Sequence, residues 1–305
     1  MKLLFDSHTH INNDTYSEEE RAQLIADIAA SDVAYAMDIG FDLASSERAV
    51  SDAALLPWCY AAVGVHPHDT KTMTEEIYEK LRCLAGRPKV QAIGEIGLDF
   101  YYNHSDAEDQ RYWFRRQIRL ANALRMPIAI HAREADQETM DILKEEGAFS
   151  DERCSWFPLR PGTGIGRKAD ETFSGADSGK HADGGGTAGT DLCREKDARV
   201  LLHCFSGSRE LAEQYVKLGA TISIAGPVTY KNNRKTSEVV SAIPIEYLLV
   251  ETDAPYLTPE PYRGKKNKSP YVEYTARRVA LLKGMPYEEV ARRTLENAKR
   301  FYGIE

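Results

Sequence analysis

Eight short apolar segments of the chain alternate with longer amphipathic segments. Most of the apolar segments are continuous runs without polar alternation, as in strands that are covered on both faces. Strands that alternate with helices in this way predict a parallel sheet, and eight such units predict a (β/α)8 TIM barrel. An open, doubly wound sheet is the alternative that the same pattern allows. The predicted strands are 3–8, 33–40, 60–66, 90–95, 127–131, 200–204, 221–226 and 247–253.

One long segment between the fifth and sixth predicted strands, residues 150–198, breaks this pattern. It is rich in glycine and has little periodic apolar content, which predicts a flexible insertion within a single domain that spans residues 1–305. The segment follows a helix and precedes a strand, so we expect it at the amino-terminal end of the barrel. Replacing residues 152–196 by a short link is therefore expected to leave fold and activity nearly unchanged.

Composition excludes several classes of protein. The chain has 305 residues, of which 42% are hydrophobic, and its net charge of −8 argues against a general nucleic-acid-coating protein. No apolar run is long enough for a membrane span or for the core of a signal peptide. The five cysteines are odd in number and lack a CxxC pair, so we expect free thiols. These features predict a cytoplasmic protein, and no obligate protein partner is evident.

Six side chains of metal-binding type lie at the ends of five predicted strands. In a barrel all these ends meet on one side, where barrel enzymes place their catalytic residues. Imidazole and carboxylate groups suit zinc, manganese, magnesium or a similar ion. Six ligands exceed what one catalytic ion needs, so they predict two divalent ions, with Glu95 as the carboxylate that bridges them. The six residues are His8, His10, Glu95, His131, His203 and Asp253.

Basic residues follow the same strand ends. Arg133 is two residues beyond His131 and shares its direction, so it could clamp a phosphate or pair with a nearby carboxylate. Arg263, Lys265 and Lys266 follow the eighth strand, in a loop where barrels often bind phosphate. Further cations follow the seventh strand. Two basic loops beside a metal site favour an anionic substrate, and a merely solvated charged surface is the alternative.

Several motifs follow one another in a fixed order along the chain. They are DSHTH, GVHPH, GEIGLDFYY, IHAR, HCFSGS, ETDAPYLTP and PYRGKKNKSP. Together they resemble the motifs of the TatD-type metal-dependent deoxyribonucleases of the amidohydrolase superfamily. The resemblance runs from Phe5 to about Asn297, apart from residues 150–198, and implies hydrolysis of DNA phosphodiester bonds, often from the 3′ end. Single-stranded ends are the expected substrate, because a duplex would not easily reach a barrel mouth.

The resemblance also implies how the ligands divide between two ions. One ion would be held by His8, His10, Glu95 and Asp253, and the other by Glu95, His131 and His203.

A hydrolytic mechanism follows from these assignments. Asp253 is expected to orient or deprotonate the attacking water. His66, in the GVHPH motif, is expected to donate a proton to the leaving oxygen, unless it only supports its loop.

Two other functions stay open on the sequence. An ester or amide hydrolase, such as a D-aminoacyl-tRNA deacylase, would use the same ions and the same basic loops. A metal-loaded scaffold without turnover is the second, and the complete ligand set argues against it.

Overall fold

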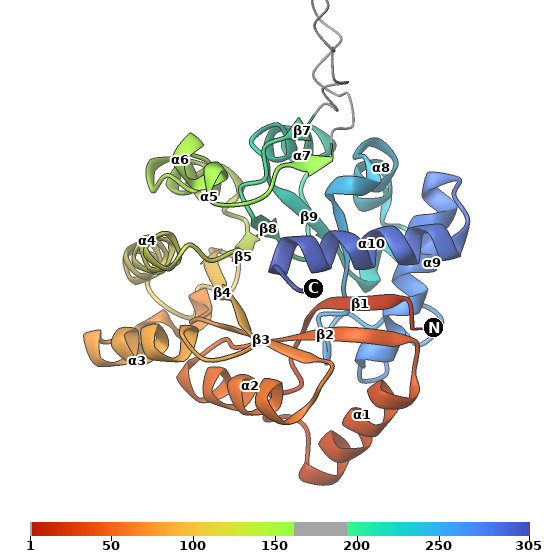
Figure 1. Ribbon diagram of the computed structural model, residues 1–305, viewed down its shortest axis with the longest axis horizontal. Helices are drawn as coiled ribbons and strands as arrows, with labels where there is room; N and C mark the ends of the chain where they lie inside the picture. The colour runs from red at the N-terminus through yellow and green to blue at the C-terminus, as the bar shows by residue number, and fades with distance from the viewer. Residues whose placement is uncertain (1, 162–193) are drawn as a thin grey trace, which may run out of the picture.

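The parallel strands of the protein form one sheet that curls into a barrel (Figure 1). The computed structural model describes residues 2–161 and 194–305. Neighbours in the sheet follow chain order, β1-β2-β3-β4-β5-β8-β9-β10, which confirms the predicted (β/α)8 barrel and rejects the doubly wound alternative. The strands are β1 Leu4–Thr9, β2 Val33–Ile39, β3 Cys59–Val63, β4 Val90–Asp99, β5 Ile128–Arg133, β8 Val200–Leu202, β9 Thr221–Ile224 and β10 Leu248–Val250.

Helices surround the barrel, and local capping fixes where several of them begin. Ser17 accepts a hydrogen bond from the Glu20 amide, and the Glu20 carboxylate accepts one from the Ser17 amide. No helix in residues 2–161 and 194–305 has the length and hydrophobicity that a membrane span requires. The helices are α1 Glu18–Ala30, α2 Leu43–Leu55, α3 Glu75–Ala85, α4 Ala107–Leu124, α5 Asp136–Glu145, α6 Asp151–Ser155, α7 Arg209–Lys217, α8 Arg234–Ala242, α9 Val272–Lys283 and α10 Tyr287–Tyr302.

Hydrogen bonds between the ends of β1 and β10 bring the first and last strands together. The amide of Asp253 donates to the carbonyl of His8 at 2.9 Å, and the amide of His10 donates to the carbonyl of Ala254 at 2.9 Å. The Ser7 hydroxyl donates to the Val250 carbonyl at 3.0 Å. Residues separated by almost the whole chain therefore meet at the carboxyl end of the barrel.

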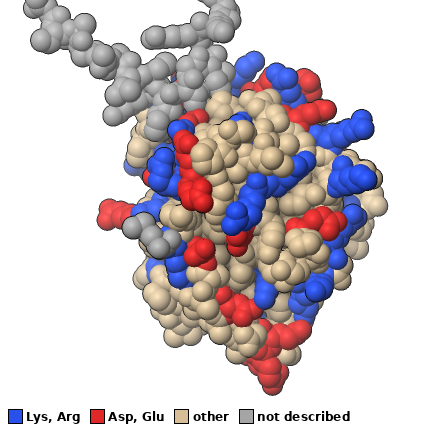
Figure 2. Space-filling model, turned by 90° about the vertical axis from the view of Figure 1, so that its right-hand side faces the viewer, with Lys and Arg blue, Asp and Glu red and all other residues tan. Residues whose placement is uncertain are grey.

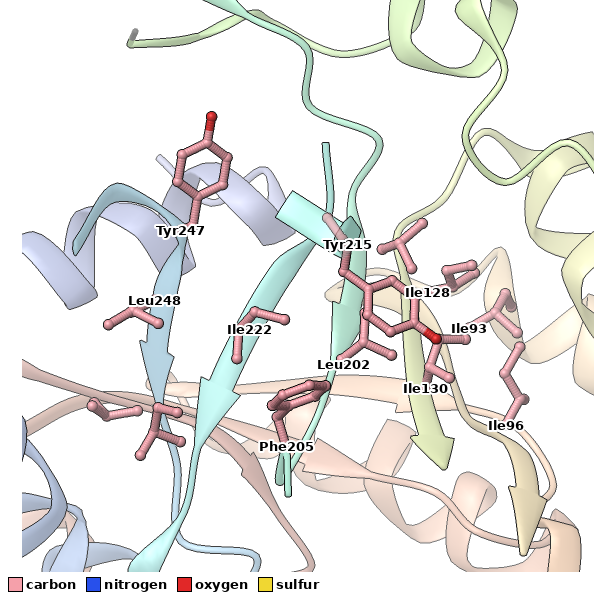
Figure 3. Close-up of a cluster of buried hydrophobic side chains, with 14 of the residues drawn as sticks. Ile93, Ile96, Ile128, Ile130, Leu202, Phe205, Tyr215, Ile222, Tyr247 and Leu248 are labelled. Atoms are coloured by element: carbon pink, nitrogen blue, oxygen red, sulfur yellow. The ribbon is translucent and has the colours of Figure 1, made fainter. Parts of the chain in front are cut away.

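The apolar core has two parts. One lies between the strands and the surrounding helices, and Figure 3 shows Ile128 and Ile130 of β5 packed beside Tyr215 of α7. The other fills the barrel interior and includes Phe301 and Tyr302 of α10. Helix α10 crosses one end of the barrel (Figure 1) and donates to carbonyls just before β10. The amino-terminal end is thus closed, and the carboxyl end is left for a site.

The two described ends of the predicted insertion are folded. Helix α6 is followed by β6 Arg160–Pro161, which pairs antiparallel with β7 Arg194–Glu195. Arg153 is fully buried and donates to the carbonyls of Ala198 and Met126 at 2.9 and 2.8 Å. The described ends of the predicted segment 150–198 therefore contain regular structure. Residues 162–193 lie outside the described residues, so the prediction of a flexible insertion is not tested for them.

Arg160 anchors this hairpin to the amino-terminal end of the barrel. It is fully buried, lies 3.0 Å from the Asp197 carboxylate and donates to the Thr221 hydroxyl at 2.9 Å. Its guanidinium lies 4.1 Å from the centre of the Tyr247 ring. The expected position of the segment is thus confirmed at its described ends. The expectation that residues 152–196 are dispensable is not supported, because a replacement would remove two buried arginines.

Candidate metal centre

The six predicted ligands converge at the carboxyl end of the barrel, around Glu95. One oxygen of Glu95, Oε2, lies 3.3 Å from Nε2 of His8 and 3.8 Å from Nε2 of His10. The other, Oε1, lies 2.8 Å from Nδ1 of His131 and 2.7 Å from Nε2 of His203. The two oxygens of one carboxylate therefore face two different pairs of histidines.

Asp253 completes the first of these groups. Its Oδ1 lies 3.4 Å from Nε2 of His10 and 3.8 Å from Nε2 of His8. The backbone hydrogen bond between Asp253 and His8 holds the two residues in this relation. Three nitrogen and oxygen donors of His8, His10 and Glu95 lie within 4.8 Å of one another.

Unpartnered nitrogen atoms support a metal at this position. Both ring nitrogens of His8 are buried and have no hydrogen-bond partner among the described residues. Buried polar atoms are normally paired, so an orphaned imidazole needs another kind of partner. Nitrogen and carboxylate oxygen donors at these spacings match the ligand set of a divalent transition metal. The residues therefore fit the metal that the sequence predicts.

The outer partners of the histidines fix which nitrogen is available. Nδ1 of His10 lies 2.8 Å from the Ile39 carbonyl, which can only accept, so Nδ1 carries the proton and Nε2 keeps its lone pair. Nε2 of His131 lies 3.1 Å from Oδ2 of Asp99, on the side of the ring away from Glu95. Carboxylates and carbonyls behind metal-binding histidines orient them in this way.

Glu251 has a comparable position behind His203. The Glu251 carboxylate is fully buried, accepts a hydrogen bond from the Cys204 amide at 2.7 Å and lies 3.4 Å from Nδ1 of His203. Sequence analysis missed both Glu251 and Asp99. A signal was available for Asp99, because it is four residues beyond Glu95 and side chains of equal parity share one face of a strand.

Strand β4 is longer than predicted, which explains that omission. The prediction ended the strand at Glu95, whereas β4 continues to Asp99. A side chain at Gly97 would place its Cβ 1.9 Å from the His131 carbonyl oxygen. Glycine at this position therefore lets β4 and β5 run close together past the predicted ligands.

The ionisable groups of the metal centre strongly shift one another's pKa. Burial would raise the pKa of Glu95, but His203, His66 and the hydrogen bond from His131 hold the pKa well below its ordinary value. Burial would lower the pKa of His203, but Glu95 and Glu251 raise the pKa well above its ordinary value. The buried carboxylates thus favour positive charge where the ligand atoms converge.

His66 lies beside this centre and differs from the six predicted ligands. Its Nδ1 accepts a hydrogen bond from the His68 amide at 3.1 Å, so the proton of the neutral ring is on Nε2. That nitrogen lies 3.5 Å from Oε1 of Glu95. Burial holds the pKa of His66 well below its ordinary value, so the ring is neutral at pH 7. In this form His66 donates a hydrogen bond through Nε2. Donor atoms of His66, Glu95 and His131 also lie within 4.8 Å of one another, so Nε2 would have to lose its proton before it could bind a metal there.

A cavity of about 750 Å³ opens onto the centre. This size is within the range of roughly 300–1,000 Å³ for small-molecule sites. Arg133 lines the cavity, and its guanidinium lies 4.2 and 4.6 Å from the ring centres of Tyr101 and Tyr102. Tyr256 also lines it and is about half exposed.

The other predicted substrate-binding residues differ in whether they line a cavity. Arg263 lines a second cavity beside the first. Lys266 lies 2.9 Å from the Glu20 carboxylate, and Lys265 lies 5.5 Å from the centre of the Tyr262 ring. Neither lysine is among the described residues that line the two cavities. The ion pair leaves Lys266 little free charge for a substrate, which argues against its predicted role.

A barrel whose carboxyl end gathers four histidines and two carboxylates, with orphaned imidazole nitrogens, defines the class of metal-dependent hydrolases. Within this class, the family model described as TatD related DNase matches residues 5–156 and 181–303. The chain belongs to the TatD-related DNase family.

Similarity to individual proteins is consistent with membership of this family. The chain is 37% identical over 302 residues to a Bacillus subtilis protein named "Uncharacterized metal-dependent hydrolase YabD", covering 99% of this chain and 100% of the relative. It is 29% identical over 307 residues to the "3'-5' ssDNA/RNA exonuclease TatD" of Erwinia tasmaniensis, covering 99% and 100%. The crystal structure of YJJV, a TatD homolog from Escherichia coli K12, shares the fold with a TM-score of 0.78 and 24% identity, over 100% of this chain and 99% of that one.

Proposed function

We propose that the protein binds two divalent ions and hydrolyses phosphodiester bonds of single-stranded DNA from the 3′ end. The observation that carries the two-ion proposal is the arrangement of Glu95, whose oxygens face separate pairs of histidines at 2.7 to 3.8 Å. A bridging carboxylate of this kind suits two ions ~3.5–4 Å apart. One ion would be held by His8, His10, Glu95 and Asp253, and the other by Glu95, His131 and His203.

The ions, when bound, supply positive charge for the phosphate oxygens and a water nucleophile at neutral pH. The residues around them supply orientation and proton transfer. The pKa of Asp253, which burial would raise, is lowered by His10, His203 and His8, so the carboxylate is ionised at pH 7. It can accept a hydrogen bond or a proton from the attacking water.

The leaving oxygen and the non-bridging phosphate oxygens also need hydrogen-bond donors. His66 presents the Nε2–H group beside Glu95 and donates a hydrogen bond to the leaving oxygen, which takes its proton from water. Arg133 has a rigid fork of donors at the cavity wall and holds a non-bridging phosphate oxygen. His66 and Arg133 thus act on the substrate without binding a metal.

A single-stranded substrate is supported by the aromatic rings at the cavity. Tyr101 and Tyr102 are about half exposed and flank Arg133. Exposed rings beside cations stack on unpaired bases, which contributes ~1–3 kcal/mol per base. The Erwinia relative is itself named a 3'-5' ssDNA/RNA exonuclease, and the substrate proposed for this protein agrees with that name.

A direct assay tests the proposal. The enzyme is dialysed against excess chelator, its metal content is measured, and release of nucleotides from a 3′-labelled single strand is followed before and after manganese or zinc is restored. Loss and recovery of release, with two ions per chain, are expected. Undiminished release in chelator refutes the metal site. Faster release from an aminoacylated RNA than from DNA would favour the deacylase alternative, and absence of turnover on both would favour a scaffold.

A further inference from the structure

A second cavity, of about 550 Å³, lies next to the metal cavity. Ser206 lines both cavities, so they are continuous along this side chain. Four cations line the second one, which we call the basic cavity. They are Lys231, Arg234, Lys235 and Arg263, and all four are exposed.

The charge of the basic cavity is largely uncompensated. Within residues 2–161 and 194–305, none of the four cations has a carboxylate within 4.0 Å, although Glu260 lines the same cavity. By contrast, Lys266 and Lys268 of the neighbouring loop pair with Glu20 and Asp27 at 2.9 and 2.7 Å. In a chain of net charge −8, unpaired cations gathered in one cavity make a local site for anions.

The surrounding backbone supports binding of anions there. Helix α8 begins at Arg234, and Asn233 caps it by accepting a hydrogen bond from the Thr236 amide at 3.2 Å. The positive end of the helix therefore adds to the charge of the side chains. Arg263 is held over the Tyr230 ring at 4.3 Å, and the Tyr230 hydroxyl donates to the Thr258 carbonyl at 2.9 Å.

A third cavity continues from the basic cavity. It shares Lys231, Asn233 and Arg234 with the basic cavity and is also lined by Arg209, Arg278, Glu210 and Glu238, so cations and carboxylates are mixed there. Arg209 pairs with Glu213 at 2.7 Å. Figure 2 shows one side of the molecule, where Lys and Arg side chains lie among Asp and Glu, so basic character alone does not distinguish this surface. The distinguishing property is unpaired charge that is continuous with the metal cavity.

We infer that the basic cavity binds backbone phosphates on the 5′ side of the scissile bond, so that the enzyme prefers a strand over an isolated dinucleotide. This inference rests on the proposed function. The 3′-terminal nucleotide occupies the metal cavity, and the strand leaves past Ser206 towards Lys231 and Lys235. Contacts to phosphates carry no base specificity, so the preference depends on length and not on sequence.

Substitution of the cations tests the inference. The variants are Lys231→Gln/Lys235→Gln and Arg234→Gln/Arg263→Gln, and the matched control is Lys144→Gln/Lys217→Gln. Lys144 and Lys217 are exposed and lie near the carboxyl ends of α5 and α7, at the opposite end of the barrel. Turnover is measured on a thymidine dinucleotide and on a thymidine dodecanucleotide at several salt concentrations.

We expect KM for the dodecanucleotide to rise several-fold in both basic-cavity variants, while dinucleotide turnover and the control remain as in the parent. For single strands each lost phosphate contact should reduce the slope of log affinity against log salt by about 0.7. An unchanged KM and slope, or an equal loss on both substrates, would overturn the inference.

A failure of the proposed function gives a different result. If the parent enzyme hydrolyses neither substrate, fluorescence anisotropy with the labelled dodecanucleotide still compares its binding to the parent, the variants and the control. Weaker binding in the two basic-cavity variants alone supports the phosphate site, and equal binding in all four proteins overturns it.

Discussion

Asp99 accepts hydrogen bonds from two imidazoles of the centre through one oxygen. Its Oδ2 lies 3.1 Å from Nε2 of His131 and 2.8 Å from Nε2 of His68. The other oxygen accepts from the amides of Tyr101 and Tyr102, so the carboxylate is fixed in position. Asp99 therefore orients Nδ1 of His131 towards Glu95, and it also connects the metal centre with the loop that carries the two exposed tyrosines.

The substitution Asp99→Asn should weaken one ion more than the other. An amide keeps the size of the carboxylate but cannot stabilise the same proton on His131. Loss of such outer partners typically costs 10–100-fold in metal affinity. Competition with a chelator should show this loss for one of two ions. Asp69→Asn is the control, because Asp69 lines the same cavity. Equal affinities in Asp99→Asn and the parent would contradict the role.

Much of the fold and of the centre could be predicted from the sequence, because both depend on local patterns. The strand ends carry His8, His131 and Asp253, and parallel topology alone brings such ends together. Partners that depend on distant contacts could not be predicted. Glu20 neutralises Lys266 from a helix more than two hundred residues away, and a charge run does not show whether its members are paired.

The folded hairpin shows a second limit. Arg153 and Arg160 are among the largest fully buried side chains, yet arginine normally indicates an exposed segment. Their guanidinium groups donate to carbonyls, to Asp197 and to Thr221, which periodicity cannot show. A segment held by buried polar contacts therefore resembles a flexible one in its sequence.

Glu95→Ala should remove more metal than any single histidine variant. Because its oxygens face both pairs of histidines, its loss weakens both ions. His203→Ala should reduce the content of one ion only. Metal analysis after gel filtration separates the two cases, with circular dichroism as the check on folding. Two ions retained by Glu95→Ala would exclude it as the bridge.

His66→Gln should keep both ions and lose activity in a way that depends on the leaving group. A hydrogen bond from Nε2 stabilises the charge that develops on a basic leaving oxygen, and loss of such a donor costs about 10²–10³-fold in turnover. A nitrophenolate leaves without a proton, so turnover of a nitrophenyl phosphodiester should fall far less than turnover of DNA. A drop in metal content to one ion would instead make His66 a ligand, against the assignment of its proton to Nε2.

Asp197 should make stability depend on acid pH. Burial would raise its pKa, but Arg160 and Arg300, with a hydrogen bond from Arg160, hold the pKa below its ordinary value. A carboxylate with a lowered folded-state pKa stabilises the fold above its unfolded pKa of ~3.9, and that contribution is lost as the pH falls through the folded-state pKa.

The variant Asp197→Asn isolates this contribution. Breaking a buried ion pair typically costs about 3–5 kcal/mol, so urea unfolding at pH 7 should show a loss of that order. The difference between variant and parent should shrink below about pH 4, where Asp197 of the unfolded parent binds a proton, and should be lost once the folded carboxylate is protonated as well. Asp151→Asn, whose side chain is exposed in its pair with Lys196, should change little. A difference that does not vary with pH would point to packing instead of charge.

The final prediction separates the two parts of the glycine-rich segment. Pro161 and Arg194 are register partners in the antiparallel β6–β7 pair, so a short glycine-containing turn can join them in place of residues 162–193. That shorter protein keeps Arg153 and Arg160 and should retain stability, metal content and turnover. Replacing residues 152–196 removes both arginines and leaves Asp197 as a buried, poorly paired charge. The urea midpoint of that protein should therefore fall markedly. Both replaced segments are attached at the amino-terminal end of the barrel. The carboxyl end, with the metal centre, is therefore the same in the two proteins. Loss of turnover in the shorter replacement, with metal content and midpoint unchanged, would show that residues 162–193 act at the active site.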